Sequence, residues 1–150
     1  NAYPYTPPVG LMNGLKLSLE MIEEEGLENV FARHTRIATG VRLAVKAWGL
    51  EMCATSPDVY SDSVSAIKTP EGFNATDIVT VAAEKYGMAF GVGLGEVAGK
   101  GFRIGPLGML TDAMMLSGLS VAEMVMVDLG LDIKLGSGVA AAQEFYRHSA

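Results

Sequence analysis

The stretch FGVGLGEVAGKGFRIGPLG, residues 90–108, decides how the middle of this chain can fold. Seven of its nineteen residues are glycine, which permits tight turns and close backbone contacts that a Cβ atom would block. The β-branched and aromatic run Gly101–Ile104 predicts a strand within it. Arg103 is the charged residue of that strand, and its planar guanidinium suits two-point binding of a carboxylate or phosphate. A structural ion pair, or a position on a solvent-facing side of a sheet, explains the same residue equally well.

The same stretch does not match the common nucleotide-binding motifs. In Gly91–Gly95 the third glycine comes too early for a dinucleotide fingerprint, and no helix is expected to begin directly behind it. Lys100 is followed by Gly101 rather than by Ser or Thr, which excludes a P-loop. We therefore expect no nucleotide site here.

Hydrophobic periodicity around this stretch predicts a mixed α+β fold. Helices are expected at 9–25, 27–48, 75–86, 110–129 and 138–147, and strands at 50–54, 63–67, 88–90 and 102–104. The fourth helix is expected to bury Met114, Ser117, Gly118, Val121, Ala122 and Val125. Paired short strands with helices gathered on one side favour a two-layer sandwich with a small, mainly antiparallel sheet over a doubly wound parallel sheet.

Composition limits the possible partners and the compartment. The 150 residues are 49% hydrophobic and 19% charged, which is typical of a globular domain. A net charge of −6 argues against a nucleic-acid or anionic-membrane partner, and no run approaches the ~20 apolar residues of a membrane span. The single cysteine, Cys53, cannot form an internal disulfide and is expected to be a small core residue, so we expect a reducing, cytoplasmic location.

Three segments together resemble one known family. Residues Gly99–Gly108 (GKGFRIGPLG) are similar to the strand motif of the class V pyridoxal-phosphate aminotransferases, the serine–glyoxylate and alanine–glyoxylate group. Residues Gly26–His34 (GLENVFARH) resemble a second motif of that group, and Tyr3–Pro8 (YPYTPP) a third. The resemblance covers essentially the whole chain, in order, and corresponds to the C-terminal part of such an enzyme.

This resemblance implies a function and a set of site residues. It implies the small C-terminal domain of a fold-type I enzyme at 26–150, preceded by an arm and helix at 1–25 that lead from a large domain. Arg103 would bind the substrate carboxylate, while Tyr3 and Thr6 would bind the phosphate of pyridoxal 5'-phosphate. The expected partners are amino-acid and 2-oxo-acid substrates, the large domain and a second subunit of a homodimer.

The lysine that forms a Schiff base with the cofactor is not expected among these residues. None of the six lysines matches the position that the resemblance requires, and Lys100, which is near Arg103, belongs to the strand motif instead. We therefore expect no catalytic residue in this chain and no activity from the chain alone. Its first residue is Asn1 rather than Met, so we expect a segment to precede it.

Two departures from the family pattern bear on the amino donor. Members of the serine–glyoxylate type usually carry His where this chain has Pro106, and Asp where it has Met109. Both positions are close to Arg103, so serine, alanine and aspartate all remain open as donors. A non-catalytic amino-acid-binding regulatory domain and a dimerisation domain also remain open. His34 is expected to be a packed, hydrogen-bonded residue, since no second metal ligand lies three or four residues away.

Overall fold

The computed structural model describes residues 3–149, which form two compact units. The first unit ends at Arg33 and the second begins at His34. The helices are α1 (Val9–Glu25), α2 (Leu27–Ala47), α3 (Ala75–Tyr86), α4 (Asp112–Asp128) and α5 (Ser137–His148). The strands are β1 (Glu51–Met52), β2 (Ser65–Lys68), β3 (Gly91–Val92) and β4 (Gly101–Ile104), with short 3₁₀ turns at Pro57–Val59 and Gly95–Val97.

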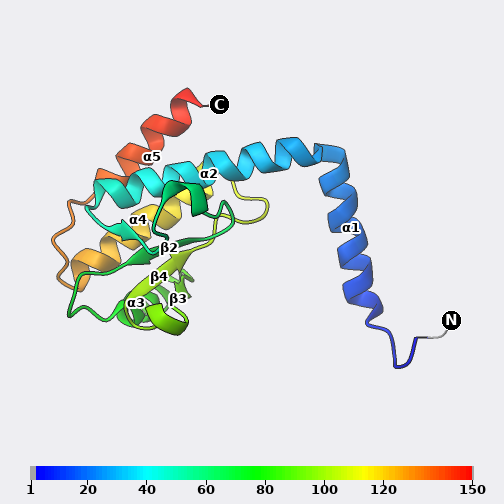
Figure 1. The fold of residues 1–150 in the computed structure, drawn as a ribbon, viewed down its shortest axis with the longest axis horizontal. Coiled ribbons are helices and arrows are strands. Elements are labelled where there is room, and N and C mark those ends of the chain that lie inside the picture. The colour runs from blue at the N-terminus through cyan, green and yellow to red at the C-terminus, as the bar shows by residue number, and fades with distance from the viewer. Residues whose placement is uncertain (1–2, 150) are drawn as a thin grey trace. The chain divides into compact units, whose positions relative to one another are not determined.

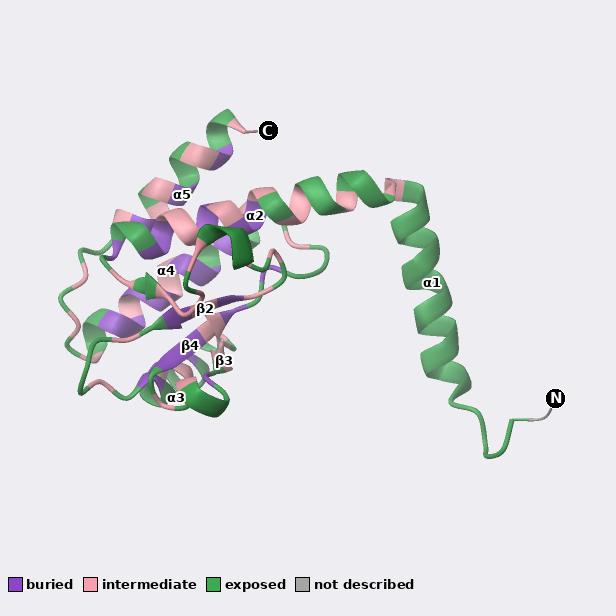
Figure 2. Ribbon diagram, in the orientation of Figure 1, coloured by how far each residue is buried: buried purple, intermediate pink, exposed green. Residues whose placement is uncertain are grey.

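The first unit consists of an extended arm, α1 and the beginning of α2. No residue of α1 is buried, and Figure 2 shows this helix exposed except at its end next to α2. The Arg33 guanidinium donates to both carboxylate oxygens of Glu25, at 2.6 and 2.8 Å, across the Gly26 turn. Among the described residues, no helix has both the length and the apolar character needed to cross a membrane.

The second unit is built on a four-stranded antiparallel sheet with the strand order β1-β2-β4-β3 (Figure 1). In the central pair, Ala66 lies opposite Arg103 and Ile67 lies opposite Phe102. The edge strand β3 pairs with the other side of β4, where Gly91 lies opposite Arg103. Because side chains alternate between the faces of a strand, Ala66, Arg103 and Gly91 share one face of the sheet.

The helices of the second unit pack on the opposite face. Ile67 and Phe102 are fully buried and belong to one hydrophobic cluster with side chains of α2, α3, α4 and α5. In Figure 2 the buried segments of α2 and α4 lie next to buried β2 and β4. This arrangement confirms the predicted α+β class, with a small antiparallel sheet and helices gathered over one face.

Most element positions agree with the sequence, and one strand does not. Helix α3 has the predicted bounds; it begins after Asn74, whose side chain accepts from the N–H of Thr76, and ends at Gly87 in the left-handed region. The predicted strand at 88–90 is wrong, because β3 begins three residues later, at Gly91–Val92. Phe90 instead packs its ring on Phe102, with centroids 6.0 Å apart in an edge-on arrangement.

The predicted buried face of the fourth helix was partly wrong. Met114 is 54% exposed, whereas its neighbour Met115 is 4% exposed and joins the core. Ser117 is also exposed, and Leu119 is fully buried. Because α4 is apolar around most of its circumference, periodicity alone could not determine which side faces the sheet.

A buried carboxylate connects α2, α4 and the beginning of α5. Glu123 of α4 is 2% exposed. Its Oε1 accepts from Trp48 Nε1 at 2.9 Å, from the Gly138 N–H at 2.7 Å and from the Val139 N–H at 3.1 Å, and its Oε2 accepts from the Gly136 N–H at 2.5 Å. The carboxylate thus satisfies the N–H groups that a helix leaves unpaired at its first turn.

Replacing Glu123 by Gln should therefore destabilise the fold. The amide keeps the shape but turns an NH₂ group toward N–H donors and removes the charge, so we expect the free energy of unfolding to fall by about 2–3 kcal/mol. Urea unfolding of the whole protein measures this. Glu84→Gln on exposed α3 is the matched control, with an expected change below about 0.5 kcal/mol. Equal stability of the two variants would contradict the structural role of Glu123.

Candidate functional site

The candidate site is the open face of the sheet around Arg103. This side chain is half-buried and lies in a row with Ala66 and Gly91. The two neighbours are small, so the guanidinium can lie over the sheet surface instead of being displaced from it. Phe102 and Ile104, on either side of Arg103 in the chain, are buried against the helices and hold the strand in place.

The Arg103 guanidinium is anchored at one nitrogen. Its Nε donates to the carbonyl oxygen of Val92 at 2.8 Å. Within residues 3–149, no carboxylate pairs with Arg103, and Nη1 and Nη2 make no hydrogen bond. The structural ion pair that the sequence left open is therefore not found in the described part of the chain. A half-buried cation with an unused pair of donors can bind a planar anion such as a carboxylate.

The loop that follows β4 is anchored to α2. The Gly108 N–H donates to Nε2 of His34 at 3.0 Å, and the Leu110 N–H donates to the Gly108 carbonyl at 2.9 Å. Because Nε2 accepts this bond, it carries no proton, so in the neutral imidazole the proton is on Nδ1. The prediction of a hydrogen-bonded histidine is confirmed. Among the described residues no group of three potential metal ligands occurs.

The same loop distributes its side chains unequally. Pro106 is fully buried, whereas Leu107 and Met109 are 66% and 68% exposed. A replacement at Pro106 therefore acts through packing, while Met109 can contact a ligand directly. The departures from the family pattern at Pro106 and Met109 therefore differ in kind, since one affects packing and the other affects the exposed surface.

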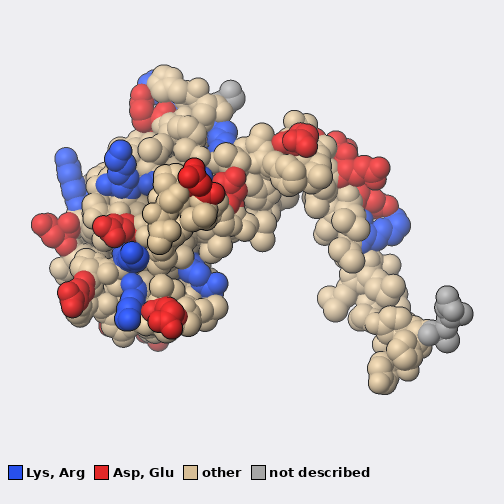
Figure 3. All heavy atoms as spheres, in the orientation of Figure 1, with Lys and Arg blue, Asp and Glu red and all other residues tan. Residues whose placement is uncertain are grey.

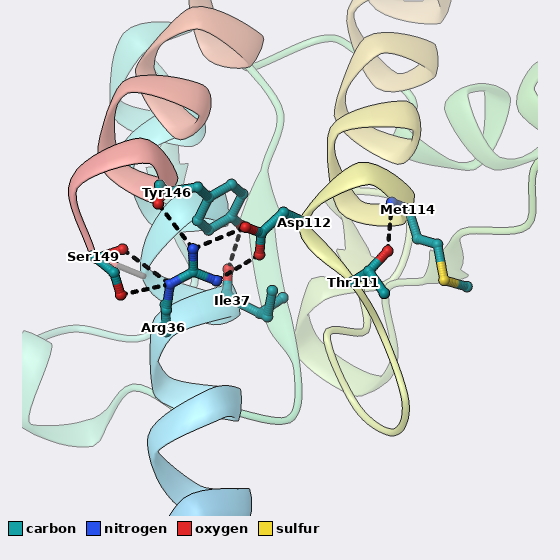
Figure 4. A network of polar contacts seen from close by, with 7 residues as sticks. All are labelled: Arg36, Ile37, Thr111, Asp112, Met114, Tyr146 and Ser149. Atoms are coloured by element: carbon teal, nitrogen blue, oxygen red, sulfur yellow. Dashed lines mark hydrogen bonds and ion pairs between the residues drawn. The ribbon is translucent and has the colours of Figure 1, made fainter.

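The end of the loop is held by an arginine that sequence reasoning missed. Figure 4 shows Arg36 of α2 between the beginning of α4 and the end of α5. Its Nη1 and Nη2 donate to the Asp112 carboxylate at 2.5 and 2.8 Å, and Nη2 also donates to the Tyr146 carbonyl at 2.9 Å. Its Nε donates to the Ser149 carbonyl at 2.8 Å. The hydrogen bond to Asp112 raises the pKa of Arg36.

No local pattern in the sequence distinguishes Arg36 from other charges on the helix. Its partners come from residues 76 to 113 positions away along the chain. Beside it, the Thr111 hydroxyl accepts from the Met114 N–H at 3.3 Å and caps α4. By holding the start of α4, Arg36 also holds the end of the loop that connects β4 to α4.

Two other predicted site residues, Tyr3 and Thr6, lie in the extended arm of the first unit. Tyr3 is 60% exposed and Thr6 is also exposed. Their hydroxyls make no hydrogen bond to any residue within 3–149. Lys100 is exposed as well and lies one residue before β4.

A cleft between α2 and β1 is a weaker candidate. Its volume is about 800 Å³, and it is lined in part by Arg42, Glu51, Tyr60 and Lys68. Arg42 donates to Asp62, and Lys68 is 3.7 Å from Glu51. Arg42 and Lys68 are therefore paired, and the remaining cation of the lining, Lys46, is exposed and has no planar fork for a carboxylate. Figure 3 shows charges of both signs spread over this unit.

Comparison with known proteins supports an aminotransferase. No family model matches the chain. The L-aspartate–glyoxylate aminotransferase of Paracoccus denitrificans is 71% identical over 149 residues, which is 99% of this chain and 38% of that protein. The serine–glyoxylate aminotransferase of Hyphomicrobium methylovorum is 53% identical over 148 residues, 99% of this chain and 36% of that protein. The crystal structure of pyridoxamine–pyruvate aminotransferase from Mesorhizobium loti superposes on the whole chain with a TM-score of 0.92 at 32% identity, covering 38% of its own chain.

In fold and in sequence the chain matches the class V pyridoxal-phosphate aminotransferases. The chain corresponds to the C-terminal part of glyoxylate aminotransferases that are named for serine or aspartate, as its motifs predicted. It spans little more than a third of the length of these relatives.

The bond between His34 and Gly108 can be tested by hydrogen exchange. Replacing His34 by Phe keeps a ring but removes the acceptor, so we expect the loop at 105–111 to exchange its amide hydrogens several-fold faster, as the loss of one hydrogen bond of about 1 kcal/mol implies. Mass spectrometry of the intact protein measures this. His148→Phe, at an exposed position near the end of α5, is the control. Unchanged exchange at 105–111 would mean that other contacts hold the loop.

Proposed function

We propose that this chain is the part of a pyridoxal-phosphate-dependent aminotransferase that binds the carboxylate of the substrate, with glyoxylate as the amino acceptor. The observation that carries the proposal is the Arg103 guanidinium, half-buried on the open face of the sheet with Nη1 and Nη2 unused among the described residues. A carboxylate is common to amino donor and 2-oxo acceptor, so one cation can serve both half-reactions.

The amino donor is proposed to be L-aspartate, with serine and alanine as the alternatives. The relative named for aspartate is 71% identical to this chain, against 53% for the relative named for serine. The exposed Met109, where the serine type usually carries Asp, is the residue of this loop best placed to contribute to the choice.

The arm of the first unit is proposed to hold the phosphate of the cofactor. Tyr3 and Thr6 fit this role, because their exposed hydroxyls have no partner within residues 3–149 and can donate to phosphate oxygens. When bound, pyridoxal phosphate supplies an electron sink for negative charge on the substrate. The Schiff-base lysine lies outside these residues in this proposal, and this chain contributes binding and orientation.

The exposed apolar surface of the first unit supports a role within a larger protein. Its exposed apolar side chains are Val9, Leu11, Met12, Leu15, Leu17, Leu19, Met21 and Ile22 on α1, and Leu27 and Phe31 on α2. Figure 3 shows no charged side chain at the beginning of α1. A helix that is apolar on several sides is normally buried. We propose that the large domain of the aminotransferase and a second subunit cover it.

Substitution of Arg103 in the whole enzyme tests the proposal. Arg103→Lys keeps the charge but loses the planar fork, so we expect the KM for both amino donor and glyoxylate to rise. Arg103→Ala should lower kcat/KM by one to several orders of magnitude, since losing one partner of a desolvated charge pair costs roughly 2–5 kcal/mol. Steady-state kinetics with L-aspartate and glyoxylate measures both effects.

The control for this experiment is Arg147→Lys, at an exposed residue of α5 that pairs with Glu144. We expect its kinetics to match those of the unmodified enzyme. Near-normal kinetics of Arg103→Ala with both substrates would show that Arg103 is structural and would overturn the proposed function.

A complementation experiment tests whether Tyr3 and Thr6 act on the cofactor of the neighbouring subunit. Pro4, Pro7 and Pro8 stiffen the arm, which suits it to crossing an interface. Two inactive full-length variants are mixed, one without the Schiff-base lysine and one carrying Tyr3→Phe with Thr6→Ala. If the site is shared, the mixed dimer has one intact site and activity returns. If subunits exchange and activity stays absent, the arm serves its own subunit.

A further inference from the structure

The position opposite Arg103 on the edge strand is occupied by a glycine. In the register of β3 and β4, Gly91 lies directly beside Arg103. A Cβ atom at Gly91 would be 3.0 Å from Arg103 Nε, 3.1 Å from its Cβ and 3.4 Å from its Cζ. The Arg103 side chain therefore lies directly over the backbone of Gly91.

These distances leave no room for a side chain at Gly91 without a movement of Arg103. Ordinary contacts of a Cβ atom are 3.4–4 Å. The Cβ of Arg103 is fixed by the strand, whose register with β2 is continuous over four residues. The Nε is fixed by the Val92 carbonyl at 2.8 Å. A methyl group at Gly91 must therefore push the guanidinium away from this carbonyl or separate the two strands.

We propose that Gly91 is a positioning residue for substrate binding: together with the Val92 carbonyl it forms a seat that fixes the orientation of the Arg103 guanidinium. This inference rests on the proposed function, in which Arg103 binds the substrate carboxylate. Because Nε is engaged by the carbonyl, the seat presents the edge formed by Nη1 and Nη2 to the carboxylate. Both oxygens then pair with the two terminal nitrogens, and the plane of the carboxylate follows the plane of the guanidinium.

Both residues of the edge strand β3 belong to the seat. This strand has only two residues; one of them supplies the empty space, and the other supplies the carbonyl acceptor. A guanidinium held in one orientation loses less conformational freedom when the substrate binds, which strengthens binding without any additional contact.

The test is Gly91→Ala in the full-length enzyme, with the KM for glyoxylate and for L-aspartate measured separately from kcat. We expect both KM values to rise several-fold, because Arg103 must shift by a few tenths of an ångström and a misplacement of about 1 Å can cost about 100-fold. Gly105→Ala is the matched control. It lies two residues from Arg103, and a Cβ there would meet only the Ser63 carbonyl oxygen, at 4.0 Å. Its KM values should stay within about twofold of those of the unmodified enzyme.

A second background shows whether the effect passes through the guanidinium. Lysine at position 103 keeps the Cβ atom that faces Gly91 but has no Nε–H donor for the Val92 carbonyl. In Arg103→Lys enzyme the change Gly91→Ala should therefore raise KM by a clearly smaller factor than in the unmodified enzyme, the non-additivity expected of coupled residues. A merely structural defect would raise KM by the same factor in both backgrounds. If Gly91→Ala folds in the Arg103→Lys background but not in the unmodified enzyme, the clash with the guanidinium is shown directly, and failure to fold in both backgrounds overturns the seat.

The outcomes separate this inference from the proposed function. KM values of Gly91→Ala within twofold of normal, or an equal rise in the Arg103→Lys background, overturn the seat while leaving Arg103 as the binding residue. Near-normal kinetics of Arg103→Ala overturn the proposed function itself. A rise in both KM values that is clearly smaller in the Arg103→Lys background supports the seat.

Discussion

The second unit depends on one arginine that joins three helices. Arg36 projects from α2 and places its guanidinium between the start of α4 and the end of α5, where Asp112, the Tyr146 carbonyl and the Ser149 carbonyl accept its hydrogens. The negative end of the α5 dipole and the carboxylate at the start of α4 both favour a cation at this point. The guanidinium also lies over the Tyr146 ring, 5.1 Å from its centroid. This arrangement fixes the helical layer on which the sheet rests.

Tyr146 makes a second contact between α5 and α2, at Ile37 and Gly40. The Tyr146 hydroxyl donates to the Ile37 carbonyl at 2.8 Å, and a Cβ at Gly40 would be only 2.2 Å from that hydroxyl. Because residue 40 is a glycine, the Tyr146 ring can lie directly against α2, where a Cβ atom would block it. Burial raises the pKa of Tyr146, which keeps its hydroxyl protonated as a donor. At the other end of the layer, Glu123 holds the first turn of α5 through backbone N–H groups.

The packed helical layer also holds Arg103 in place on the open face of the sheet. One face of β4 is committed to the core through Phe102 and Ile104, so Arg103 must point the other way. The loop after β4 is held on its way to α4 by His34, and α4 by Arg36. Strand and loop thus keep the cation in place while leaving its terminal nitrogens available.

The fold class, the helix positions and the choice of Arg103 as the candidate ligand residue could all be predicted from the amino-acid sequence. Local signals were sufficient for these: periodic apolar residues, the Asn74 cap and the glycine-bounded strand. The three motifs, which occur in order along the chain, were sufficient to suggest the family. The buried side of α4, the pairing of β3 and the residues that support Arg103 became visible only in the folded chain. Those depend on contacts between residues far apart in the chain, such as Arg36 with Asp112, and on a space above Gly91 that exists only once β3 and β4 lie side by side.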